Sequence, residues 1–224
     1  VISQTGFSGE SGYEIYLRNA TLYADDMWDA VLEAGKKHNL MVIAPAHHRR
    51  IQAGILSWGQ DLDHEHNPFQ CNLGYQVSLS GKGEWEKKGD YIGKQALEKM
   101  KADLKDGHKP YKLQLVGFEI GGKPIDEYAP DFWLVSPGDG GDPCGFITSP
   151  WYHPEKGKNI AMGYIPFDGT LNPNGFPKWE LGKKFKVHLP DIYADEPGVP
   201  VDAVTVDVPF TESFNANTRE VVKG

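Results

Sequence analysis

The chain has 224 residues, of which 39% are hydrophobic and 24% charged, and its formal net charge is −8 at neutral pH. This composition is typical of globular proteins, and no apolar run approaches the roughly 20 residues that a membrane-spanning helix requires. Lys and Arg do not cluster as they do in a nucleic-acid footprint. We therefore expect one large domain or two small ones, with no nucleic-acid partner and no membrane partner.

The start of the chain has the pattern of a small sheet followed by a helix. Alternating residues over 13–18, preceded by a glycine-rich turn, predict a strand, a turn and a second strand over residues 1–18. From Leu22 to His38 the apolar residues recur at helical spacing, with acidic residues near the start. This pattern predicts an amphipathic helix packed on that sheet.

A second helix is expected after this one. Pro45 fits the first turn of a helix. Ile51, Ile55 and Trp58 then follow along one face, and Gly59 marks the expected end.

The second half of the chain has a different pattern of apolar and turn-forming residues. Residues 90–97 look like a turn that feeds a third helix ending near Leu104, and DGHKP at 106–110 joins this helix to strand-like sequence. We therefore expect two domains, 1–109 and 110–224. In the second, short apolar segments alternate with Gly, Pro and Asp clusters, as in a small antiparallel β-barrel. The expected strands are Leu113 to Ile120, Trp133 to Val135, Gly145 to Thr148, Ala161 to Ile165, Phe185 to Leu189 and Ala203 to Val208.

The cysteines and the first residues bear on the cellular setting. Cys71 and Cys144 are far apart and lack CxxC spacing, so neither a disulfide framework nor a structural zinc site is expected. Residues 1–5 lack the basic leader and apolar core of a signal peptide. We expect two reduced thiols in a cytoplasmic protein, and the absence of an initiating Met suggests a fragment or a processed chain.

Several side chains are candidates for chemistry. Glu14 and Tyr16 are alternate residues of an expected strand and so face the same way. From position alone, Glu14 is most simply an outward-facing carboxylate, and Tyr16, Phe7 and Trp58 are most simply packed aromatics. The run DLDHEH at 61–66 offers five metal-ligand side chains but has no HExxH or EF-hand spacing. We expect a hydrogen-bonded loop there and no metal site.

Two motifs in the first third of the chain resemble a known family. Residues 6–16 read GFSGESGYEIY and residues 50–61 read RIQAGILSWGQD. This ordered pair resembles the folate-binding core of the family that contains the T-protein of the glycine cleavage system and its tetrahydrofolate-dependent demethylase relatives. Further stretches resemble later motifs of the family: NPFQCNLG at 67–74, YIGKQAL at 91–97, NIAMGYI at 159–165 and VPF at 208–210.

The resemblance implies tetrahydrofolate as the cofactor and gives roles to the candidate side chains. It implies that Glu14 binds the pterin, because a carboxylate can accept a forked pair of hydrogen bonds from neighbouring N–H donors. It implies that Tyr16 meets the reacting methyl group, where a phenol could donate a proton or hydrogen bond to the leaving atom. Phe7 and Trp58 become candidate walls of the pterin slot.

A departure from the family pattern bears on the reaction. PAHH at 45–48 stands where T-proteins have Ala-Arg-Asp, so a folate-contacting arginine is missing, and Gln52 replaces a customary glutamate. We therefore expect a demethylase that moves a methyl group from a small methylated acid, either methoxy-aromatic or sulfonium, to N5 of tetrahydrofolate. An aminomethyltransferase of the glycine cleavage system and a non-catalytic folate-binding relative are the alternatives.

The resemblance also implies an α+β fold. Family members form three domains around a central folate hole, and this chain would supply the C-terminal part: an α/β folate-binding portion followed by a small β-barrel. The remaining N-terminal part, on the same enzyme or on a second chain, would then be the partner that completes the site.

Overall fold

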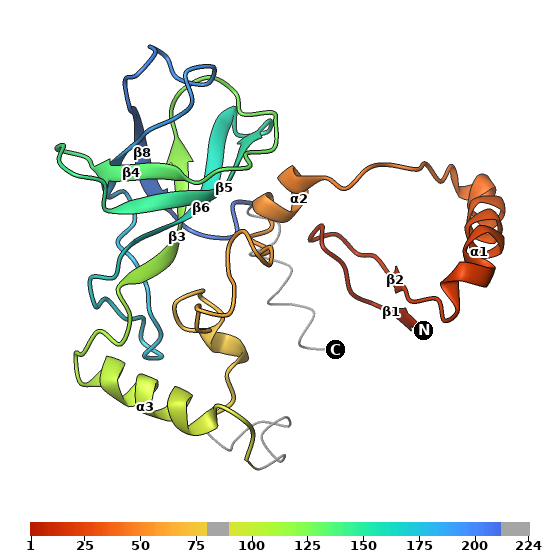
Figure 1. Ribbon diagram of the computed structural model, residues 1–224, viewed down its shortest axis with the longest axis horizontal. Helices are drawn as coiled ribbons and strands as arrows, with labels where there is room; N and C mark the ends of the chain where they lie inside the picture. The colour runs from red at the N-terminus through yellow and green to blue at the C-terminus, as the bar shows by residue number, and fades with distance from the viewer. Residues whose placement is uncertain (80–89, 212–224) are drawn as a thin grey trace.

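The computed structural model describes residues 1–79 and 90–211, and its main body is a closed antiparallel barrel with strand order β3-β6-β5-β4-β7-β8 (Figure 1). The expected barrel is therefore confirmed, and each expected strand overlaps an observed one. The strands are β3 (Leu113–Ile120), β4 (Trp133–Pro137), β5 (Gly145–His153), β6 (Lys158–Pro166), β7 (Lys184–Val187) and β8 (Val201–Val206).

The barrel interior is filled by apolar side chains from all of its strands. Strands β3 and β6 pair along their whole length, from Leu113 opposite Pro166 to Ile120 opposite Asn159. Inside, Phe118 and Phe185 meet edge to face with ring centroids 5.9 Å apart. Aromatic pairs prefer this arrangement to a face-to-face one. Alternate residues of the same strands point outward, which provides an outer face for other segments to cover.

Helix α2 (His47–Gln52) covers part of this outer face. Its Ile51 is buried in a cluster with Leu115, Met162 and Tyr164 of the barrel. On another side, α3 (Lys94–Lys105) contributes the buried Leu104 to a separate cluster, which confirms the third expected helix. A short 3-10 helix, η2, spans Gly74–Gln76.

The helix expected from Pro45 to Gly59 is wrong in its extent, since α2 ends at Gln52. Gly54 adopts a left-handed backbone (φ 68°), and the N–H of Ile55 then bonds the carbonyl of Arg50 at 2.8 Å. This is the hydrogen bond of a glycine-terminated helix end. Trp58 consequently lies beyond the helix, and the chain turns back toward the barrel.

Gly54→Ala is expected to destabilise the protein more than Gly59→Ala. Both glycines have positive φ, at 68° and 81°, which costs an alanine about 1–2 kcal/mol. A Cβ on Gly54 would also collide with Val208, whereas one on Gly59 would meet nothing within 4 Å. We expect the collision to add about 1–3 kcal/mol, measured as the free energy of unfolding in urea. Equal losses in the two variants would contradict this packing.

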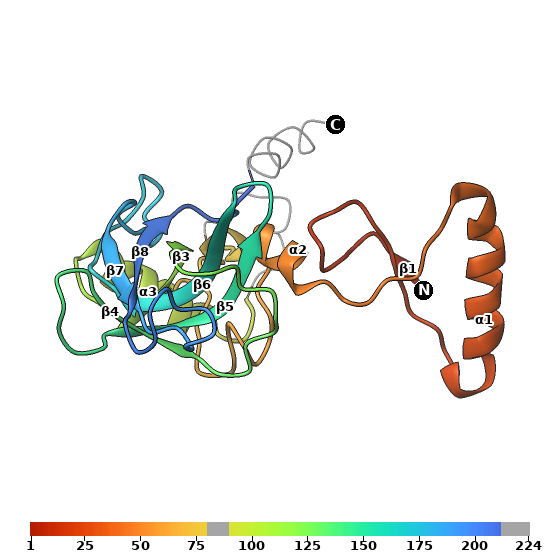
Figure 2. The ribbon, with the colours of Figure 1, turned by 90° about the horizontal axis from the view of Figure 1, so that it is seen from above.

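The N-terminal part extends away from the barrel. Strands β1 (Ile2–Ser3) and β2 (Glu14–Ile15) pair as an antiparallel hairpin, so the expected strand, turn and strand are confirmed. Helix α1 (Ala20–Gly35) and the 3-10 helix η1 (Lys36–His38) follow. In both views α1 lies far from the barrel (Figures 1 and 2).

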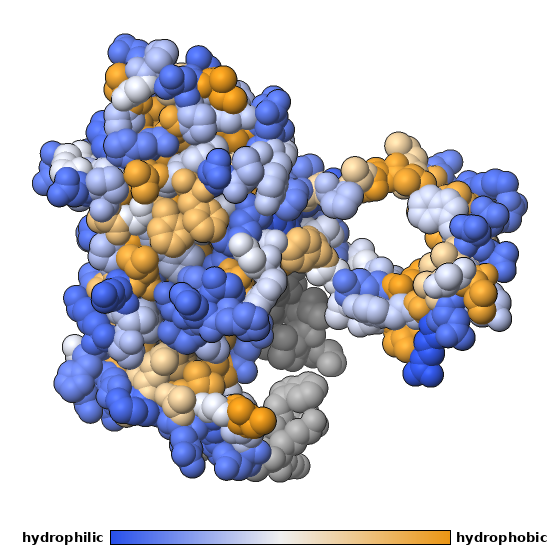
Figure 3. All heavy atoms as spheres, in the orientation of Figure 1, coloured by the Kyte–Doolittle hydropathy of each residue, from blue (hydrophilic) through white to orange (hydrophobic). Residues whose placement is uncertain are grey.

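The predicted packing of α1 on the sheet is wrong. None of its residues is buried, because the two-residue strands of the hairpin are too short to form a sheet surface that could cover a helix face. Tyr23 and Trp28 are each about half exposed, and apolar side chains lie on the surface of this part of the molecule (Figure 3). Of the helices that the structure describes, none combines the length and apolar character needed to cross a membrane.

Candidate functional site

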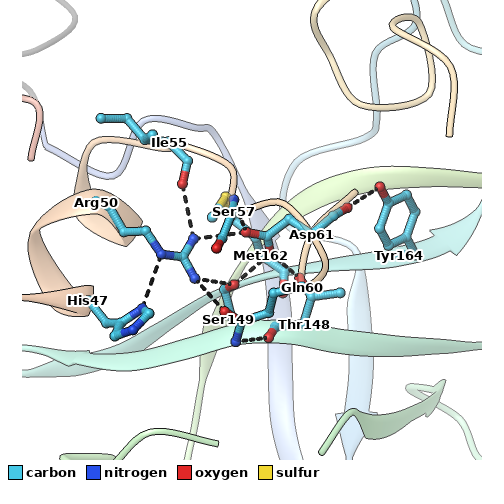
Figure 4. Close-up of polar contacts among 10 residues, drawn as sticks. All are labelled: His47, Arg50, Ile55, Ser57, Gln60, Asp61, Thr148, Ser149, Met162 and Tyr164. Carbon is cyan, nitrogen blue, oxygen red and sulfur yellow. Dashed lines mark hydrogen bonds and ion pairs between the residues drawn. The ribbon is translucent and has the colours of Figure 1, made fainter. Parts of the chain in front are cut away.

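A buried ion pair joins α2 to the loop that follows it, beside β5 of the barrel (Figure 4). Arg50 Nη1 donates to Asp61 Oδ2 at 2.8 Å, and each residue is only 1% exposed. A guanidinium has five N–H donors, and the other four also find acceptors. These are His47 Nδ1 at 3.3 Å, the Ile55 carbonyl at 3.0 Å, Gln60 Oε1 at 2.9 Å and Ser149 Oγ at 2.8 Å.

An irregularity in β5 completes the surroundings of Asp61. The pairing of β5 with β6 shifts register between Ile147 and Ser149, which marks a β-bulge. Successive strand residues normally face opposite sides, but a bulge re-aims a side chain. Thr148 and Ser149 both donate to Asp61 Oδ1, at 2.5 and 2.6 Å, and the N–H of Ser57 donates to Oδ2 at 2.8 Å.

This cluster holds the structure together and is not itself a reactive centre. Its charges are paired and buried, and their hydrogen-bonding positions are filled by groups of the protein, so neither side chain has a position left to contact a substrate. The sequence indicated Arg50 only as part of a motif and placed Asp61 in a polar loop. The sequence did contain a signal for this contact. A glycine such as Gly54 can end a helix and turn the chain back, which allows Arg50 and Asp61, eleven residues apart, to meet.

The possible metal ligands of the run DLDHEH at 61–66 point in different directions. Asp61 points into the protein, whereas Asp63 pairs with His66 at 2.7 Å and accepts the N–H of Glu65 at 2.8 Å. In the part of the chain that the structure describes, no group of three or more His, Cys, Asp or Glu residues is arranged to hold a metal ion.

Glu14 and Tyr16 lie together on the N-terminal hairpin, as their alternate positions predict. The Tyr16 hydroxyl donates to Glu14 Oε2 at 3.1 Å, and the Thr5 hydroxyl donates to the same oxygen. Within residues 1–79 and 90–211, no hydrogen bond reaches Oε1 of Glu14. Tyr16 is 55% exposed. Glu14 is partly exposed, and one of its carboxylate oxygens is available to a further donor.

The turn of this hairpin is docked beside α2. Arg49 Nη1 lies 3.2 Å from Glu10 Oε1, and the Arg50 guanidinium lies 5.8 Å from the centre of the Phe7 ring. Glu10 of the hairpin turn thus has a charged partner on α2. Phe7 lines a cavity of about 390 Å³ together with Ser8, residues 43–46, His47 and Arg49.

Trp58 lies apart from Glu14, Tyr16 and Phe7. Its ring is 61% exposed and packs edge-on against His64, with centroids 4.8 Å apart. The structure therefore brings Glu14 to Tyr16 and Phe7 to α2, and places Trp58 on the loop beyond α2. The roles of all four in folate binding stay predictions.

His47 connects the ion pair to an aromatic patch on the barrel. Its Nδ1 accepts from Arg50, and its ring lies 4.9 Å from that of Tyr128 and 6.5 Å from that of Trp151. Burial, followed by the nearby Arg50 charge, lowers the pKa of His47, while Asp61 acts in the opposite direction. The fold therefore favours the neutral imidazole.

Acid is expected to destabilise the protein partly through His47. The unfolded chain binds this proton near the ordinary pKa of 6.5, so stability falls as the pH drops below 6.5 and through the lowered folded-state pKa. In His47→Gln, the loss of unfolding free energy between pH 7.5 and 5 should be smaller than in the wild type. Burial also lowers the pKa values of His48 and His153, so some loss should persist. Identical pH profiles would contradict a role for His47.

Comparisons with known proteins bear on the family. Residues 1–81 match the model of the GCVT N-terminal domain. The chain is 30% identical to an aminomethyltransferase of Caldanaerobacter subterraneus over 74% of this chain and 39% of that protein. It is 33% identical to the aminomethyltransferase of Symbiobacterium thermophilum over 74% of this chain and 40% of that protein. These findings support a place in the glycine cleavage T-protein superfamily.

A solved structure of the T-protein superfamily supports the fold. The crystal structure of glycine cleavage system aminomethyltransferase T from Bartonella henselae matches with a TM-score of 0.65 at 22% identity, covering 94% of this chain and 49% of that chain. The present chain spans about four tenths of the length of the curated relatives named above. The three-domain arrangement and the boundary between 1–109 and 110–224 stay predictions. Residues 80–89 of the first range and 212–224 of the second lie outside those described.

The relatives favour one of the reactions considered from sequence. The curated proteins named above are aminomethyltransferases, so the preference for a demethylase is not supported. The aminomethyltransferase alternative fits these relatives better. The replaced residues at 45–48 therefore do not by themselves indicate a demethylase branch.

Proposed function

We propose that this chain carries part of the tetrahydrofolate site of a one-carbon transferase of the aminomethyltransferase type. The observation that carries the proposal is the match of residues 1–81 to the GCVT N-terminal domain, because this range contains the hairpin on which Glu14 and Tyr16 lie together. The names of the relatives support the reaction type.

The geometry of Glu14 fits a pterin ligand. Oε2 is held by two hydroxyl donors on the hairpin, which fixes the direction of the carboxylate. Oε1 is open, and a carboxylate oxygen in this position can accept an N–H of a 2-amino-pyrimidinone edge. Phe7 offers an aromatic wall near the hairpin turn, although it packs toward Arg50 in this structure.

The chemistry assigned to this chain is orientation of the reactants and proton donation. When bound, tetrahydrofolate supplies the nucleophilic N5, so the protein needs no nucleophile of its own. The thiols agree with this: burial raises the pKa of Cys71 and of Cys144, which keeps both protonated and weakly reactive. Glu14 would hold the acceptor in line. The Tyr16 hydroxyl has one proton, which bonds Glu14 Oε2 in this structure, and it would turn from that oxygen to donate to the leaving atom of the one-carbon donor.

We also propose that the site is completed by a further polypeptide surface, on the same chain or on another. The support is the exposed apolar surface of the N-terminal part, where a hairpin and a helix without buried residues cannot form a core. Large hydrophobic residues that are more than a third exposed there are Val1, Ile2, Phe7, Tyr13, Ile15, Tyr16, Leu22, Tyr23, Trp28, Val31, Leu40, Met41, Val42 and Ile43.

The experiment that tests the function has two stages. Calorimetric titration of the intact protein, including the polypeptide that completes the site, with tetrahydrofolate measures binding first. The protein is then incubated with tetrahydrofolate and one of three donors: an aminomethyl-lipoyl protein, a methoxybenzoate or dimethylsulfoniopropionate. We expect 5,10-methylene-tetrahydrofolate from the aminomethyl donor, with release of ammonia and of the lipoyl thiol. Formation of 5-methyl-tetrahydrofolate from either of the other donors would favour a demethylase, and absence of folate binding would remove the proposal.

A further inference from the structure

A second cavity, of about 480 Å³, lies where segments from distant parts of the sequence meet. Gly9 of the hairpin turn, residues 53–56 after α2, residues 71–73 and Tyr75 line it from the first half of the chain. Trp179 and residues 208–209 line it from the second half. Its volume lies in the range of about 300–1,000 Å³ that is typical of pockets for small molecules.

The lining of this cavity is apolar and carries no charged side chain. Leu56, Leu73 and Leu115 form part of the wall. Each polar side chain in the lining already has a partner within the protein. Cys71 Sγ lies 3.4 Å from the Tyr164 hydroxyl, Asn72 Nδ2 donates to the Leu115 carbonyl at 2.8 Å, the Tyr75 hydroxyl accepts from Gln76 at 3.0 Å, and Trp179 Nε1 donates to the Val206 carbonyl at 3.0 Å.

We propose that this cavity binds a small uncharged aromatic molecule. A charged ligand would lose hydration and meet no counter-charge in the lining, which is unfavourable, whereas an apolar ring would remove the surfaces of both the ligand and the wall from water. The indole of Trp179 is held in place by its own hydrogen bond and offers a preformed aromatic surface. The proposal is independent of folate binding, since Glu14, Tyr16, Phe7 and Trp58 do not line this cavity.

A pair of probes of similar shape tests the chemical class without folate. The neutral probe is 4-methylanisole, and 4-methoxybenzoate is its anionic counterpart. We expect 4-methylanisole to bind at least tenfold more tightly by calorimetry and to change the tryptophan fluorescence. Equal or tighter binding of the anion would overturn the proposal.

Variants locate the binding site. Among the described tryptophans, Trp179 is the one that lines the cavity, so Trp179→Phe should remove the fluorescence change while calorimetric binding persists. Leu73→Trp, which fills the cavity, should weaken 4-methylanisole at least tenfold. The control Leu134→Trp places the same ring at an exposed position of β4 and should bind normally. If Leu73→Trp does not fold, the Trp179→Phe result decides, and an unchanged fluorescence response in that variant would overturn the proposal.

Discussion

Replacing Arg50 with leucine is expected to lower the free energy of unfolding by about 3–5 kcal/mol, as the loss of one partner of a buried ion pair does. The variant leaves the Asp61 carboxylate buried at 1% exposure without its counter-charge. Hydrogen bonds from Ser57, Thr148 and Ser149 remain, but neutral donors do not replace a charge. Urea unfolding followed by circular dichroism measures the loss.

The neighbouring arginine provides the matched control. Arg49 is paired with Glu10, and both side chains are about half exposed. Arg49→Leu is therefore expected to cost no more than about 1 kcal/mol. The double variant Arg50→Leu/Asp61→Asn should recover part of the loss seen in Arg50→Leu, because it also removes the uncompensated charge. Equal losses in the two single variants would show that the buried ion pair contributes no more to stability than the exposed one.

Replacing Glu14 with glutamine is expected to weaken tetrahydrofolate binding about tenfold to a hundredfold. A hydrogen bond to a charged group contributes about 1.5–3 kcal/mol, and each 1.4 kcal/mol is a factor of ten in the dissociation constant. The amide keeps the size of the side chain but loses the charge and one acceptor oxygen. Stability should change little, because the hairpin hydrogen bonds of Glu14 are exposed. Calorimetric titration measures the affinity.

The control for this variant is the other glutamate of the same motif. Glu10→Gln removes the same charge from the same hairpin, but Glu10 contacts Arg49 and not Tyr16. We expect its tetrahydrofolate affinity to stay within about twofold of the wild type, since an exposed ion pair contributes little. Equal weakening in both variants would mean that the net charge of the hairpin, and not Glu14, governs binding.

The strands of the barrel were predictable because their signals are local. Alternating or continuous apolar segments between Gly, Pro and Asp clusters marked each strand, and β3 spans the expected residues Leu113–Ile120. The extent of α2 was not predictable in this way. The apolar spacing continues to Trp58, but the left-handed backbone of Gly54 ends the helix, so the glycine outweighs the apolar spacing on which the longer helix was predicted.

In the candidate site, too, some contacts could be predicted from local sequence and others could not. The period of two in a strand was sufficient to place Tyr16 beside Glu14, because both lie within one short segment and the geometry of extended backbone fixes their direction. The sequence by itself also predicted the barrel and contained the motifs shared with the T-protein superfamily.

Only the tertiary structure decided which side chains surround Arg50 and Asp61. Their partner Ser149 lies 99 residues beyond Arg50 and 88 beyond Asp61. The bulge in β5 directs its side chain toward them, and no local sequence pattern predicted this bulge. The apolar cavity under the hairpin turn likewise forms from segments at both ends of the chain. Burial and charge pairing depend on what the rest of the chain brings to a residue, and the residue's own neighbours in sequence do not carry that information.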